Sequence, residues 1–152
     1  TLRTAKIKSL INLQKNNLVT RILNETADDL NYFSDQMQIE VPRLSEYFND
    51  SIEYYGLGII ESTNSKNLNS ENLLQIEKSL LHLAPSLIEL KESMVSLRAS
   101  IDSLPNLTHQ LNKGRIRAIA ILSEFINELD YNHNQVNSVL GLISDIKNDL
   151  NN

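Results

Sequence analysis

A heptad pattern of apolar residues between residues 70 and 104 constrains this sequence more than any other feature. Apolar side chains recur there at alternating intervals of three and four residues, at Leu73, Ile76, Leu80, Leu83, Leu87, Leu90, Met94, Leu97, Ile101 and Leu104. Chance would produce such an unbroken run about once in several thousand trials at this hydrophobic content. The repeat is typical of a helix that is packed along its whole length. Residues 70–104 are therefore predicted to form one long helix.

A second apolar stripe runs beside the heptad stripe, one residue after each a position. It consists of Leu74, Leu81, Ile88 and Val95. Because the combined apolar face is wider than a two-stranded seam requires, we expect this helix to pack against at least two others. Pro85 falls opposite the seam, where a kink would lie on the outer surface and spare the core.

Composition favours helices over other classes. Only four glycines and three prolines occur in 152 residues, so turns are scarce and most all-β folds are excluded. The absence of cysteine excludes a disulfide scaffold, a Cys-ligated metal site and a thiol nucleophile.

The length predicts one domain, residues 1–152, and a chain that begins Thr1-Leu2-Arg3 is interpreted as a fragment of a longer protein. We expect a cytoplasmic location, with an extracytoplasmic domain of a membrane protein as the alternative.

Residues 26–61 follow an eleven-residue repeat, which is typical of a nearly straight helix. The repeat consists of Leu30, Phe33, Met37, Val41, Leu44, Phe48, Ile52, Tyr55 and Ile59. Thr26-Ala27-Asp28-Asp29 has the spacing of a helix-capping box. Residues 4–23 form a separate helical pattern in a different frame, so we favour a break near Asn24 over one unbroken rod. A loop at 62–69 then leads into the next helix.

Residues 106–150 carry the last helical pattern, with two interruptions in its apolar stripe. Gly114 occupies one core position, where a missing side chain permits close approach of another helix. Asn132 and His133 mark the second interruption, which predicts a polar layer, a kink or a short turn. A turn at 102–106 is favoured before this helix, although a kinked continuous helix is the competing interpretation, because the heptad continues in phase.

The predicted fold is therefore all-α: an elongated antiparallel bundle of three to four long helices with coiled-coil-like packing, at about 4–23, 26–61, 70–104 and 106–150. Charge segregation favours four helices. Residues 1–21 carry five cations and no anion, whereas residues 22–61 carry nine anions and one cation. A basic first helix packed antiparallel on an acidic second one would be self-complementary.

Candidate functional residues are few. The histidines lack the Glu-x-x-His spacing of di-iron bundles, and no Gly-x-Ser-x-Gly elbow occurs, so no metal, cofactor or catalytic site is predicted. Tyr54 and Tyr55, beside Gly56-Leu57-Gly58, could line a pocket at the end of the bundle. Arg98, Lys113, Arg115 and Arg117 form the one concentrated positive patch outside residues 1–21, a candidate contact for a protein partner.

These features favour a non-catalytic helical scaffold or protein–protein interaction module, acting through a protein partner or self-association. The net charge of −5 and the lack of interleaved aromatic residues argue against nucleic-acid binding. Membrane contact is expected only through segments that flank this sequence. The alternative is a ligand-sensing four-helix input domain of a bacterial membrane receptor, in which an even number of helices would place both termini at one end.

Overall fold

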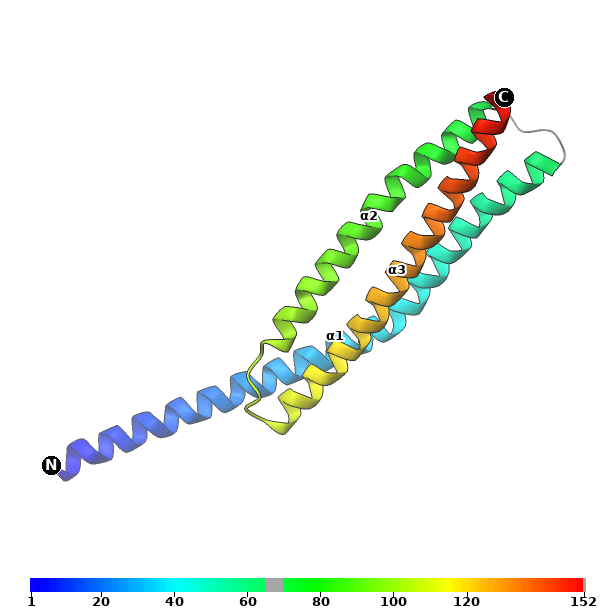
Figure 1. Ribbon diagram of the computed structural model, residues 1–152. Helices are drawn as coiled ribbons and strands as arrows, with labels where there is room; N and C mark the ends of the chain where they lie inside the picture. The colour runs from blue at the N-terminus through cyan, green and yellow to red at the C-terminus, as the bar shows by residue number, and fades with distance from the viewer. Residues whose placement is uncertain (65–69, 152) are drawn as a thin grey trace.

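The protein is a rod of three long α-helices with one helix extending well beyond the other two. The computed structural model describes residues 1–64 and 70–151, and the helices are α1 (Leu2–Asn64), α2 (Ser70–Asp102) and α3 (His109–Asn151). In Figure 1, α2 runs antiparallel to α1 and α3, and the two ends of the chain lie at opposite ends of the rod. With 63 residues, α1 alone is about 95 Å long.

Helix α3 occupies the centre of the bundle, because it packs against both α1 and α2, whereas α1 and α2 scarcely meet. Two apolar clusters line these contacts. One contains Val41, Ile52, Ile59, Leu73, Leu80, Leu87, Phe125, Leu129, Val136, Ile143 and Ile146. The other contains Ala27, Leu30, Ile101, Leu111, Ala118 and Leu122. Both clusters draw residues from all three helices, and Met37 and Met94 pack against both clusters, so the core is continuous along the rod.

The predicted break near Asn24 is wrong, since α1 continues through it as a single helix. The Thr26 hydroxyl donates to the Ile22 carbonyl at 2.8 Å, one turn earlier in the same helix, and so does not act as a cap. No glycine or proline occurs before Pro42 to interrupt the helix. The expected helices 4–23 and 26–61 are therefore one element. The structure supports a bundle of three helices, but neither a fourth helix nor the predicted coiled-coil packing.

The connection between α2 and α3 is a turn, as the favoured interpretation predicted. Helix α2 ends at Asp102, and α3 begins at His109, three residues later than expected. Thr108 caps α3, because its hydroxyl oxygen accepts from the Leu111 amide at 3.0 Å. The competing kinked helix is thus excluded. The expected loop at 62–69 is only partly tested: α1 extends to Asn64, and residues 65–69 lie outside the described residues.

The two apolar repeats largely coincide with the buried faces of α1 and α2. Leu30, Val41 and Ile52, each eleven residues apart, are buried in α1, but Leu44 is exposed and Ser45 is buried in its place. Leu73, Leu80 and Leu87 are buried at heptad intervals in α2. The second stripe of α2 does not gain the second helical partner that we expected. Its members Leu74, Leu81, Ile88 and Val95 are 37–54% exposed, because α1 packs on α3 instead.

Gly114 has the close helix approach that its core position predicts. A Cβ atom at this position would lie 3.3 Å from the Cβ atom of Leu30 and 3.5 Å from the carbonyl oxygen of Ala27. At the far end of the same seam, a Cβ at Gly56 would lie 3.5 Å from Val139. The contact at Gly56 is an ordinary van der Waals distance, so of these two glycines only Gly114 marks a tight approach of α1 and α3.

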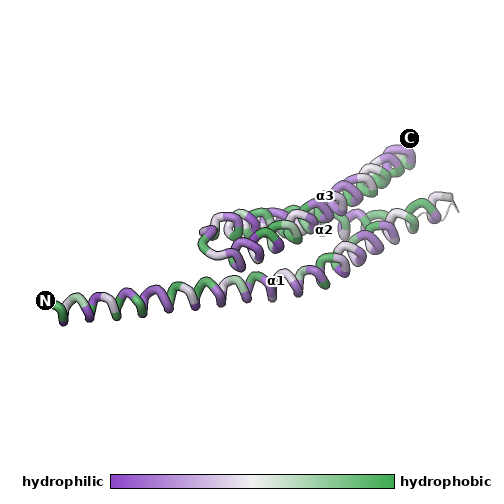
Figure 2. Tube along the Cα trace, turned by 90° about the horizontal axis from the view of Figure 1, so that it is seen from below, coloured by the Kyte–Doolittle hydropathy of each residue, from purple (hydrophilic) through white to green (hydrophobic). Residues whose placement is uncertain are grey.

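All three helices are amphipathic, and hydrophobic (green) and hydrophilic (purple) segments alternate along each of them in Figure 2. No helix among the described residues has an apolar stretch long enough to cross a membrane.

The burial of α2 predicts that two of its leucines contribute differently to stability: Leu87 at a heptad a position, and Leu81 in the second stripe. Leu87 is 2% exposed and Leu81 is 54% exposed. Leu87→Ala should lower the free energy of unfolding by about 2–5 kcal/mol, because it leaves a cavity in the core. Leu81→Ala should change the free energy of unfolding by about 0.5 kcal/mol or less. Urea denaturation followed by circular dichroism measures both, and equal losses would show that the heptad face is not the core.

The helix approach at Gly114 predicts opposite effects for one substitution at two glycines of α3. Gly114→Leu should destabilise the fold by about 1–3 kcal/mol, because the added side chain meets Leu30 and Ala27. Among the described residues, a Cβ added at Gly141 would meet no side chain and no other helix within 4 Å, apart from its chain neighbours, so Gly141→Leu should stabilise the helix by up to about 1 kcal/mol. Thermal melting would contradict the close approach if both variants gained stability.

Candidate protein-interaction surface

Residues 1–22, here called the arm, lie outside the bundle and are exposed on every side. Figure 1 shows the arm as a blue helix extending past the turn between α2 and α3. At 1.5 Å per residue it is about 33 Å long. Within the described chain, therefore, no other helix covers the arm, although its sequence is amphipathic.

The arm carries an apolar stripe with cations on both sides. Ile7, Ile11, Leu18 and Ile22 fall within about 60° of one another at 100° per residue, and each is 49–52% exposed. By the same count, Lys8 and Lys15 flank one side of the stripe, and Arg3 and Arg21 flank the other. A half-exposed apolar stripe of this length on an isolated helix is typical of an interaction surface.

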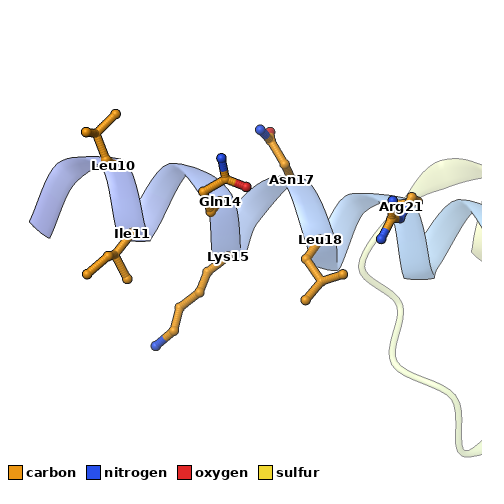
Figure 3. Close-up of a pocket in the computed structure, with 7 residues that line it drawn as sticks. All are labelled: Leu10, Ile11, Gln14, Lys15, Asn17, Leu18 and Arg21. Atoms are coloured by element: carbon orange, nitrogen blue, oxygen red, sulfur yellow. The ribbon is translucent and has the colours of Figure 1, made fainter. Parts of the chain in front are cut away.

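Figure 3 shows how the side chains of the arm are arranged. Ile11, Lys15 and Leu18 extend from one side of the helix, and Leu10 and Asn17 extend from the other. The shallow hollow between them, about 600 Å³, is lined by α1 alone, at Leu10, Ile11, Gln14, Lys15, Asn17, Leu18 and Arg21. A surface that a single helix forms suits a second elongated element better than an enclosed small molecule.

The remainder of α1 exposes a surface of opposite charge. Its outer face, which points away from α3, carries Tyr32, Ile39, Tyr47 and Tyr54, which are 57–75% exposed. Exposed acids lie among them, including Glu25, Asp28, Asp29, Glu46 and Asp50. At 100° per residue, the mean direction of this face lies within about 50° of the mean direction of the arm's stripe, so both are on the same side of α1. One helix therefore presents a basic apolar half and an acidic aromatic half on the same side.

The predicted positive patch lies where the helices meet, and three of its four cations contact the protein itself. Arg98 donates to the Ser123 hydroxyl at 3.0 Å. Arg115 donates to the Asn112 side chain at 2.7 Å and lies 3.6 Å from the Asp102 carboxylate. Lys113 is exposed, with no hydrogen bond or ion pair to the described residues.

Arg117 of the same patch links α3 to α1. Its guanidinium lies 2.6 Å from the Asp35 carboxylate and 3.0 Å from the Gln38 side-chain oxygen. These contacts, together with those of Arg98 and Arg115, join neighbouring helices or turns. The patch thus contributes to helix packing, and its proposed role in partner contact stays a prediction.

The polar interruption at Asn132 is a buried polar layer within an unbroken helix. Asn132 is fully buried and donates to the Asn49 side-chain oxygen of α1 at 2.8 Å, whereas its own amide oxygen has no partner among the described residues. His133 is partly exposed and lies 3.5 Å from Asn137. Asp130 pairs with Lys91 of α2 at 2.6 Å. A single buried amide contact between helices fixes their register more than it adds stability.

The tyrosines near the end of α1 border an open cleft between α1 and α2. The cleft measures about 660 Å³ and is lined by Tyr54, Tyr55, Leu57, Gly58, Glu61, Asn72, Gln75, Ile76 and Ser79. Apart from the two phenols, Glu61 is the one ionisable side chain in this lining. Among the described residues, no group of three histidine or acidic side chains is close enough to hold a metal ion.

The sequence pattern indicates a polar layer at Asn132, but the sequence analysis did not identify the arm as an exposed surface. The sequence feature that indicates the arm is the angular position of the apolar stripe in residues 4–23 around the helix. That position differs from the position of the bundle-facing residues of α1, including Ala27, Leu30 and Val41, by about 130° at 100° per residue. On one continuous helix, such an offset turns the stripe of the arm away from the bundle. A break between two helices, which the sequence analysis favours, is the other way to accommodate this offset.

In comparisons with known proteins, no family model matches this chain, and no curated protein or solved structure is significantly similar to it.

The buried layer predicts that removing the Asn132 amide does not weaken the fold. Asn132→Leu should be neutral or stabilising by up to about 2 kcal/mol, because it removes an unpaired buried oxygen and adds apolar contact. Asn132→Asp should destabilise the fold at neutral pH, since it buries a charge. Melting temperatures of both variants test this, and a strong loss for the leucine variant would contradict it.

Proposed function

We propose that this chain is a non-catalytic helical scaffold, or protein–protein interaction module, that binds another protein chain through the arm. The observation that carries this proposal is the half-exposed stripe of Ile7, Ile11, Leu18 and Ile22 on a helix that leaves the bundle. Burial of such side chains contributes about 25 cal/mol per Å² of apolar surface. A partner helix would therefore gain affinity along the whole arm.

The dimensions of the protein support a scaffold. Helix α1 is about 95 Å long and the bundle encloses only part of it, so its two ends can contact partners far apart. The ion pairs Lys91–Asp130 and Lys147–Glu77, at 2.6 and 2.8 Å, join α2 to α3 at two levels along the rod. A braced rod of this kind holds bound elements at a fixed separation.

We favour the receptor-domain alternative less, and it stays a prediction. It required an even number of helices with both termini at one end, whereas Figure 1 shows the two ends of the described chain at opposite ends of the rod. The scaffold is therefore the function that we favour.

The experiment that tests the proposal disrupts the stripe without touching the core. The full chain is immobilised, and proteins retained from a lysate of the source cells, including added copies of the chain itself, are identified by mass spectrometry. Wild type should retain a protein chain that the Ile11→Asp, Leu18→Asp double variant loses, because carboxylates then occupy the stripe.

The matched control is Leu13→Asp, at a leucine of the arm that is 56% exposed and lies about 150° from the stripe. It should retain the same chain as wild type. All variants should melt like wild type, since the arm lies outside the bundle. If no bound chain depends on Ile11 and Leu18, the proposed function is wrong.

A further inference from the structure

Complementary charges on α1 are left unpaired by the fold of a single chain. The five cations of the arm form no ion pair with the described residues. Of the nine anions in residues 22–61, two are paired, Asp35 with Arg117 and Glu40 with Arg43. Because α1 is one continuous helix, the basic arm cannot fold back on its own acidic segment. Contact between the two segments requires a second chain.

The apolar residues on the same side of α1 are arranged symmetrically about Glu25. Ile11, Leu18, Glu25, Tyr32 and Ile39 follow one another at intervals of seven residues. Successive members of such a series drift by only about 20° around a helix, so they form one line. The four apolar members are 49–69% exposed. In an antiparallel copy centred on Glu25, Ile11 lies opposite Ile39 and Leu18 lies opposite Tyr32.

The same register brings opposite charges together. Arg21 lies at the level of Asp28 and Asp29 of the copy, and it shares the flank of Asp28. Arg3 lies opposite Tyr47, which has Glu46 beside it. The basic half of each copy meets the acidic half of the other, and the symmetry repeats every pair. Glu25 approaches its own copy at the axis, where Arg21, one turn earlier in each helix, offsets the repulsion.

We propose that two copies of this chain pair antiparallel through α1, about a two-fold axis near Glu25, with each arm lying on the acidic outer face of the other copy. This inference rests on the proposed function and names its partner. The overlap of residues 3–47 supplies about 20 residues from each copy, at three of every seven residues on one face. That number is typical of a stable interface.

An anionic membrane is the other surface that a basic amphipathic helix fits. The charges of α1 favour a second copy instead. The stripe of the arm continues along the same side of α1 into a segment with nine anions and one cation, which an anionic bilayer would repel. A second copy uses both halves of α1, whereas a bilayer uses only the arm.

Light scattering of the full chain over a hundredfold range of concentration tests the pairing. The molar mass should rise from that of one chain, 17.3 kDa, towards twice that value. Arg21→Glu should raise the dissociation constant by about tenfold, because each copy then opposes like charges at Asp28 and Asp29. Asp28→Lys with Asp29→Lys should do the same, and an equal mixture of the two variants should restore pairing.

Cross-linking tests the antiparallel register. Since the chain has no cysteine, single cysteines can be introduced at exposed positions without competing reactions. A short bismaleimide should link a mixture of the Leu18→Cys and Tyr32→Cys variants into a dimer, and should link neither variant to itself. Self-linking of the Leu18→Cys variant would overturn the proposal in favour of a parallel arrangement.

A constant mass of one chain at every concentration would overturn the inference. Vesicles of phosphatidylserine and phosphatidylcholine, compared with phosphatidylcholine alone, then identify a lipid-binding arm, which would equally exclude the second copy as its occupant. These outcomes are separable from failure of the proposed function. A monomer that still retains another protein through Ile11 and Leu18 leaves the scaffold intact, whereas a monomer that retains none removes both.

Discussion

The packing of α3 between α1 and α2 is the interaction on which the rest of the structure depends. α1 and α2 scarcely meet, so each is held in the bundle mainly by its contact with α3. The central helix accordingly buries residues on a wide face, including Leu111, Leu122 and Leu129. A helix that satisfies two partners must be apolar around much of its circumference. The outer two helices need only one apolar stripe each.

This arrangement leaves apolar surface exposed on both outer helices. The second stripe of α2 would be covered in a closed bundle, in which every helix meets two neighbours. Here its members, such as Leu81 and Ile88, remain 40–54% exposed. Helix α1 has the same excess on its outer face and along the arm. The fold is therefore stable through α3 while keeping surface available for other chains, which is consistent with the scaffold that we propose.

Polar contacts determine how the helices align rather than whether they pack. Arg117 bridges to Asp35, and Asn132 donates to Asn49, so α3 is matched to α1 at two levels. Lys147 and Glu77 match α3 to α2. Apolar stripes tolerate a slide of one heptad, whereas these pairs are satisfied in one register. The register in turn fixes how far the arm extends beyond the turn between α2 and α3.

The sequence by itself determined the helical class, the seam of α2 and the turn before α3, because these follow from local periodicity and from the residues at helix ends. The heptad of Leu73, Leu80 and Leu87 predicts its own buried face, and Gly114 predicts a close approach. The tertiary structure decided that residues 2–64 form one helix and that the arm has no partner within the described chain. The apolar stripe changes direction near Asn24, and a chain can accommodate this change in two ways. A break would let the arm fold back, whereas a continuous helix turns its stripe away from the core. The sequence around Asn24 contains no helix breaker, so the choice depended on which faces α3 could bury, a property of the whole bundle rather than of any one segment.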